Sequence, residues 1–280
     1  MSTHTAIISK AFDTIVNSWK TAYSFSINND NRTAICSKKL EVIFPAFMIL
    51  ESTQNLKKFS SLQKEIAYWL LKQQSLKTAS FNWWHKKVEA RKQRPYPDDL
   101  DDTFCSWSAL HQLDPQLITP QVLSKLTKLL ISQEKQEGGP YRTWLADITN
   151  AEWQNYDPIV NCNIAYFLAK QHIFLQNQLL YIKEALDKNF ISPYYSSLLP
   201  CMYFFSRLYN LLPSDKQMFF HHIAQHAATI LQTQWNNIQQ TPHYAALTSI
   251  SLFRLGYRDK ILEEAKNVIL KQNTWGFGEM

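Results

Sequence analysis

Apolar positions along the chain recur with the spacing of α-helices, and they do so in two patterns. In the first pattern apolar residues occupy one face and lysines occupy the other, which is typical of amphipathic helices with one face in water. In the second pattern the segment is apolar all round, which is typical of helices in a protein interior. We expect amphipathic helices over residues 60–74, 121–132, 216–232 and 259–271, and interior helices over roughly 40–51, 102–112, 159–169, 197–209 and 244–255.

The two kinds of helix alternate along the chain. A register of roughly 40–60 residues per helix pair is typical of repeat proteins. The alternation predicts an all-α fold of the α/α toroid type, in which inner helices form a barrel and outer helices wrap around it. We expect one domain over residues 1–280, with about 11 helices.

The joints after the amphipathic helices support a repeat, because each of these helices ends on Gln and is followed by a loop with aromatic residues and sometimes glycine. Glycine can adopt the left-handed conformation that ends a helix, Gln can satisfy loose carbonyl groups, and an aromatic ring can cover the turn. The joints are Gln73 with Phe81, Trp83 and Trp84; Gln133 with Gly138, Gly139, Tyr141 and Trp144; Gln272 with Trp275, Gly276, Phe277 and Gly278; and a degenerate copy at Gln234 and Trp235.

An acidic segment, Asp98-Asp99-Leu100-Asp101-Asp102-Thr103, stands at the start of one predicted interior helix. Its four carboxylates cannot all ionise at low cost when partly buried, since desolvation and mutual repulsion both raise a carboxyl pKa. If the site is dry, at least one should keep its proton near neutral pH and could protonate an alkene. The alternative is a helix cap, because Asp and Thr side chains accept hydrogen bonds from free N–H groups and complement the helix dipole. Both roles are open.

The joints resemble the QW repeats of squalene-hopene and oxidosqualene cyclases, which occur in weaker form in protein prenyltransferase β-subunits. The best matches are Gln133–Trp144 and Gln272–Gly278, while the repeats cover most of the chain. The stretch from Asp99 to Thr103 resembles the DxDD(T) motif of class II terpene cyclases. The resemblance implies a cyclase that protonates an alkene or epoxide of an apolar isoprenoid.

The same resemblance assigns roles within the acidic segment. It implies that Asp101 donates the proton and that Asp99 and Asp102 hydrogen-bond to it and orient it. Protonation itself needs no metal, and magnesium would assist only a diphosphate substrate. Cyclases of this family pair two helical barrels with the cavity between them, whereas this chain has length for one. A lone barrel must close its cavity by itself, by forming a homodimer, or against a membrane.

Other residues are candidates for substrate binding. Aromatic rings can steady a carbocation through cation–π attraction, and Arg142 could pair with an aspartate or bind an anionic group. Three residues at the starts of later interior helices should face the same rim as the acidic segment, although each could also be a structural cap or surface residue. The candidates are Trp83, Trp84, Tyr141, Trp144 and Arg142, with Asn161, Tyr194 and His243 at the helix starts.

The composition, with 45% hydrophobic and 19% charged residues, is typical of a globular protein. Only 5 glycines are present, which disfavours a fold rich in tight β-turns. The net charge is +6, but the basic residues are dispersed, so we expect no nucleic-acid partner. The densest basic cluster is either a solvated loop face or a mouth that meets anionic lipid head groups or a diphosphate. It comprises Lys86, Lys87, Arg91, Lys92 and Arg94.

We expect the protein in the cytoplasm, with peripheral membrane contact left open. The longest apolar run, Val42 to Leu50, is broken by Pro45 and is shorter than the roughly 20 residues that span a bilayer. His222 and His226 share a helix face, but we interpret them as solvated, and the zinc site of protein prenyltransferases is not found. The cysteines lack CxxC spacing and follow no signal peptide, so we expect reduced thiols at Cys36, Cys105, Cys162 and Cys201.

Two alternatives of different classes remain. The first is a non-catalytic toroid that binds a lipid or a protein partner. The second is an α/α-barrel glycoside hydrolase with Asp101 as the acid and Asp157 as the base.

Overall fold

The computed structural model describes residues 42–195, 197–238, 242–258 and 260–271. This part of the chain is built from helices, and its only extended pairings are isolated bridges. The prediction of an all-α protein is confirmed. The joint at Gln272–Gly278 and the thiol of Cys36 lie outside the described residues.

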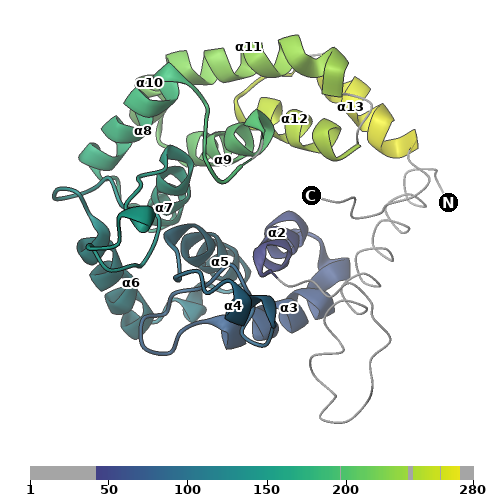
Figure 1. Ribbon diagram of the computed structural model, residues 1–280. Helices are drawn as coiled ribbons and strands as arrows, with labels where there is room; N and C mark the ends of the chain where they lie inside the picture. The colour runs from purple at the N-terminus through teal and green to yellow at the C-terminus, as the bar shows by residue number, and fades with distance from the viewer. Residues whose placement is uncertain (1–41, 196, 239–241, 259, 272–280) are drawn as a thin grey trace.

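Five helices form an inner row that follows an arc (Figure 1). Each packs on the next in chain order, and their buried side chains make up much of one continuous apolar core. All five were predicted, with ends that shift by a few residues. They are α2 (Phe44–Thr53), α5 (Leu100–Leu113), α7 (Pro158–Lys170), α9 (Leu198–Leu211) and α12 (Pro242–Arg254).

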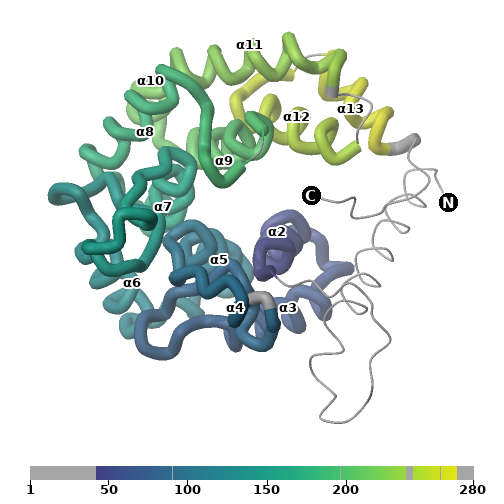
Figure 2. The backbone as a smooth tube through the Cα atoms, in the orientation of Figure 1, coloured from purple at the N-terminus to yellow at the C-terminus, as the bar shows by residue number. Residues whose placement is uncertain are grey.

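A second row of helices lies outside the first, as the tube in Figure 2 shows. Helix α8 was not predicted, although its buried Leu179, Ile182 and Leu186 carry the helical spacing. The amphipathic segment predicted over 216–232 is divided between two helices that meet at Phe220. The outer helices are α3 (Ser60–Gln73), α6 (Pro120–Gln133), α8 (Gln176–Lys188), α10 (Ser214–Phe219), α11 (His221–Ile238) and α13 (Lys260–Lys271).

The inner helices run parallel, so the row has two rims. At the N-terminal rim, Asp101 at the start of α5 is hydrogen-bonded to Tyr195, which precedes α9. At the C-terminal rim, Lys170 at the end of α7 donates a hydrogen bond to Gln112 near the end of α5. Short helices lie between the main ones: η2 (Lys57–Phe59), α4 (Ala90–Gln93), η3 (Pro115–Leu117) and η4 (Ala151–Trp153).

The predicted joints at Gln73 and Gln133 are confirmed in position, because each residue ends an outer helix. The capping contacts expected at Gln133 are corrected. Gln73 ends α3, donates to the carbonyl of Trp69 and accepts the amide N–H of Lys86, as a cap should. Gln133 ends α6, but its side-chain amide donates to the hydroxyl of Ser132 and not to a carbonyl. The residue after α6, Glu134, is extended, so the left-handed glycines that follow it belong to the loop and do not cap the helix.

The prediction of a degenerate joint at Gln234 and Trp235 is wrong. Gln234 and Trp235 lie inside α11, and the Trp235 indole N–H donates to Glu264 of α13 at 2.8 Å. Trp235 therefore ties two outer helices together within the fold and does not cover a turn.

Candidate active site

The acidic segment begins α5 and is held from both sides by the loops that follow α3 and α6. The amide of Asp99 donates to the carbonyl of Phe81 at 3.1 Å, and the amide of Leu100 donates to the carbonyl of Thr143 at 2.8 Å. Asp99 is the N-cap residue, and its Oδ1 accepts the amide N–H of Asp102 at 2.7 Å. The cap interpretation is thus confirmed, and the joints that define the repeat are what place the aspartates.

Asp99 and Asp102 form a buried acidic pair with 3% and 5% of their surface exposed. Burial first, and then the neighbouring carboxylates, raises the pKa of Asp102 to about 8. The same two causes raise the pKa of Asp99 well above its ordinary value. At neutral pH the pair therefore keeps a proton, as the clustering of carboxylates predicted.

Asp101 points elsewhere and makes different contacts. Its Oδ2 accepts the hydroxyl of Tyr195 at 2.5 Å, and its Oδ1 accepts the side-chain amide of Asn163 at 2.6 Å. The thiol of Cys105, one turn further along α5, lies 3.9 Å from Oδ1. Burial raises the pKa of Asp101, while the hydrogen bonds from Tyr195 and Asn163 act to lower it.

The expectation that Asp99 and Asp102 orient Asp101 is corrected by these contacts. Within the described residues, the hydrogen bonds to the Asp101 carboxyl come from Tyr195, Asn163 and Cys105. The physical reason is helical geometry, because adjacent residues of a helix do not face each other.

A chain of buried polar groups leads from Asp101 through the inner row to the C-terminal rim. Asn163 Oδ1 accepts a hydrogen bond from Arg207 at 2.7 Å. Arg207 forms an ion pair with Glu51, and Arg254 lies 3.8 Å from the same carboxylate. Asn163 and Arg207 have 0% and 2% of their surface exposed, so these groups interact with little screening by water.

A series of aromatic rings extends from the same carboxyl through α9 to the start of α2. The ring of Tyr195 lies 5.3 Å from that of Phe204, which lies 6.5 Å from that of Phe44. The ring of Phe44 lies 6.3 Å from that of Trp83. Tyr195, Phe44 and Trp83 are half-buried. Of the predicted aromatic candidates, Trp83 is the one that belongs to this series.

Two other predicted rings belong to a cluster on the loops that adjoins this series, since the ring of Trp84 lies 6.5 Å from that of Trp83. Trp84 stacks on Tyr96 at 5.9 Å, and Trp144 packs on Trp153 at 4.8 Å. The indole N–H of Trp144 donates to the hydroxyl of Tyr194 at 2.6 Å. Trp84, Trp144 and Tyr194 therefore stabilise the loops that hold the acidic segment, and the hydrogen bonds to the Asp101 carboxyl come from other residues.

Tyr141 and Asn161 also have structural contacts. The backbone N–H of Tyr141 donates to Asn161 Oδ1 at 2.9 Å, and its carbonyl accepts from Asn161 Nδ2 at 3.0 Å. Both residues are buried. Asn161 thus fixes the loop to the start of α7 and presents no free group at the rim.

The expected pairing of Arg142 with an aspartate is corrected, whereas His243 lies at a helix start as predicted. Arg142 donates to the side-chain carbonyl of Gln154 at 2.5 Å and to the carbonyl of Ser132 at 2.9 Å. Its guanidinium is therefore held between loop and helix, and its described contacts include no aspartate. His243 is exposed at the start of α12, with its ring 5.7 Å from that of Tyr244.

Glu51, Asn163 and Arg207 of the polar chain, and Tyr195 beside Asp101, were not among the predicted site residues, and the first three carried a signal. Glu51 and Arg207 are isolated charges in otherwise apolar interior segments, where an unpaired charge is costly, so each indicated a buried partner. Asn163 is a polar residue in a similar position. Tyr195 carried no distinct signal, because sequence spacing does not show which of two adjacent tyrosines points inward.

Both oxygens of the Asp157 carboxylate accept hydrogen bonds at the start of α7. Its Oδ1 accepts the amides of Ile159 and Val160 at 2.6 and 3.0 Å, and its Oδ2 accepts the hydroxyl of Ser192 at 2.5 Å. These contacts leave it poorly suited to activating a water molecule, which disfavours the glycoside hydrolase alternative.

The described residues include no group of three or more His, Cys, Asp or Glu side chains placed to hold a metal ion. None of the helices in that part of the chain combines the length and apolarity needed to cross a bilayer. Neither a protein-family model nor a curated protein sequence matches this chain.

Proposed function

We propose that this protein is a cyclase or isomerase that starts its reaction by protonating an isoprenoid alkene or epoxide, with Asp101 as the acid. We also propose that its inner and outer helices form the α/α toroid of the prenyltransferase and squalene-cyclase superfamily. The observation that carries the proposal is the surroundings of the Asp101 carboxyl, which is partly buried and hydrogen-bonded to Tyr195 and Asn163.

Those surroundings suit a carboxylic acid that must protonate a weak base such as an alkene. Burial raises the pKa of Asp101 and so favours the proton-loaded form. When the proton leaves, the hydroxyl of Tyr195 and the amide of Asn163 are already placed to stabilise the carboxylate that remains. The buried Asp99–Asp102 pair keeps a proton near neutral pH, which limits the negative charge beside Asp101.

The reaction transfers the Asp101 carboxyl proton to an alkene carbon or an epoxide oxygen. A carbocation forms on the substrate as its π bond or C–O bond breaks, and a second alkene of the chain then attacks it to close a ring. The faces of the half-buried Tyr195, Phe44 and Trp83 can each stabilise the cation by about 0.5–2 kcal/mol. Loss of a proton from the substrate or addition of water completes the reaction.

The test is product formation by the purified chain with farnesyl diphosphate, geranylgeranyl diphosphate and squalene, analysed by mass spectrometry. Asp101→Asn should lower the rate by about 10²-fold or more, because general acid catalysis contributes on that scale. Asp98→Asn is the matched control, since Asp98 accepts hydrogen bonds from Ser80 and Asn82 and lies outside the Asp101 contacts. Equal rates for both variants would contradict the proposal. No cyclic product from any substrate would favour a non-catalytic toroid.

A further inference from the structure

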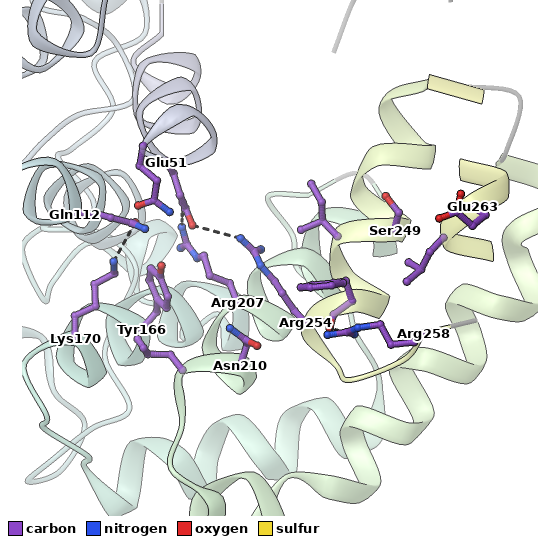
Figure 3. Close-up of a pocket in the computed structure, with 15 residues that line it drawn as sticks. Glu51, Gln112, Tyr166, Lys170, Arg207, Asn210, Ser249, Arg254, Arg258 and Glu263 are labelled. Carbon is purple, nitrogen blue, oxygen red and sulfur yellow. Dashed lines mark hydrogen bonds and ion pairs between the residues drawn. The ribbon is translucent and has the colours of Figure 1, made fainter. Parts of the chain in front are cut away.

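A cavity of about 770 Å³ lies at the C-terminal rim, at the opposite ends of the inner helices from the acidic segment. Figure 3 shows its side chains converging from the ends of the inner helices and from α13. Among its described lining residues, four cations face two carboxylates, which leaves a formal charge of +2. The charged residues are Lys170, Arg207, Arg254, Arg258, Glu51 and Glu263.

The floor of the cavity is a buried group in which two arginines share one carboxylate. The side chains of Arg207 and Glu51 are 1% and 4% exposed, and Arg254 approaches Glu51 from the cavity side (Figure 3). Within the described part of the chain, Nε of Arg207, Nη1 of Arg254 and Oε1 of Glu51 have no hydrogen-bond partner. One carboxylate cannot neutralise two guanidinium groups, so net positive charge remains at the floor.

The walls add two further cations. Lys170 donates to Gln112 at 3.0 Å, and burial lowers its pKa to about 8. Arg258 donates to the carbonyls of Phe253 and Tyr257 at 2.7 and 2.9 Å. Cations near helix C-termini also complement the helix dipole. That role accounts for exposed last-turn cations, but it does not account for a buried Arg207 that shares the Glu51 carboxylate with Arg254.

We infer that this cavity binds a small polyvalent anion of the phosphate class, such as the diphosphate group of a soluble phosphorylated compound. Tetrahedral phosphate oxygens can accept hydrogen bonds from several guanidinium and ammonium groups at once, and guanidinium forms the strongest pairs of this kind. An anion with two or more charges would balance the formal +2 of the lining. This site lies at the other rim from Asp101, and the inference does not depend on the proposed cyclisation.

Isothermal titration of the full chain with inorganic pyrophosphate tests the inference. The wild type should bind, and Arg258→Gln and Lys170→Gln should each raise the dissociation constant about 10-fold, the effect of losing one charge-assisted hydrogen bond. Arg94→Gln and Lys128→Gln remove exposed cations outside the cavity and should bind like the wild type. Arg207 is left intact, because its loss would leave Glu51 buried without its partner.

Absence of binding by the wild type, unchanged affinity in both cavity variants, or equal losses in the control variants would overturn the inference. A second arm separates the source of the phosphate group by sedimenting the protein with vesicles of phosphatidylcholine, with and without phosphatidic acid. Pyrophosphate binding without vesicle binding supports a soluble ligand. Vesicle binding that depends on phosphatidic acid and on Lys170 would instead assign the same site to a lipid head group.

Discussion

Replacing Glu51 by Gln should destabilise the protein strongly, because it removes a negative charge from a group that is cut off from water. The Glu51 and Arg207 side chains are 4% and 1% exposed. Leaving one member of a buried ion pair without its partner costs about 3–5 kcal/mol. Arg207 keeps its hydrogen bond to Asn163 and its position 4.2 Å from the ring of Tyr166, so the low end of that range applies, about 3 kcal/mol.

A loss of this size is readily measured. For a domain of this size it corresponds to a fall in Tm of roughly 6–12 °C, and urea denaturation gives the free energy directly. Glu263→Gln is the matched control, since the Glu263 side chain is 72% exposed and its ion pair with Lys266 should contribute little. The double variant Glu51→Gln with Arg207→Met should recover part of the stability, because no unpaired charge remains between them. A Glu51→Gln variant as stable as Glu263→Gln would refute this reasoning.

Two further predictions concern the acidic segment. Tyr195→Phe removes a hydrogen bond that lowers the Asp101 pKa, so the high-pH limb of the rate profile should move to higher pH and the plateau rate should fall. Tyr194→Phe is the control. Identical pH–rate profiles for the two variants would contradict the assignment of Asp101 as the acid. Because the folded pKa of Asp102 is raised to about 8, its contribution to stability is present at low pH and is lost as pH rises from about 4 to about 8. Asp102→Asn should therefore show a smaller fall in urea midpoint over that range than the wild type, and an unchanged fall would count against the raised pKa.

The interior helices were predictable because their signal is local. A segment such as 159–169, apolar on every side, can be stable only when surrounded by other elements, and α7 lies there. The position of the acidic segment was predictable for a similar reason, since Asp99 marks a helix start in the sequence and caps α5 in the structure. Helix α8 also carried a local signal, the helical spacing of Leu179, Ile182 and Leu186.

The partners of Asp101 were not predictable in this way. Asn163 and Tyr195 lie 62 and 94 positions further along the chain, and nothing in the local pattern relates them to α5. The predicted candidates failed for a related reason. Trp144 and Arg142 have the residue types that suit a cation or an anion, but their loop gives them closer partners in Tyr194 and Gln154. Residue type indicates which chemistry is available, and long-range packing decides where it is used.

The measurement that tests the central proposal most directly is isotope incorporation from D₂O. If Asp101 delivers the first proton, the product formed by the wild type in D₂O should carry one deuterium at the carbon of the protonated alkene, and Asp101→Asn should form that product at least about 10²-fold more slowly. With an epoxide substrate the label would enter an exchangeable hydroxyl, so an alkene substrate is required. A cyclic product that carries deuterium at the same carbon and forms at the same rate with Asp101→Asn would contradict the assignment of Asp101 as the acid.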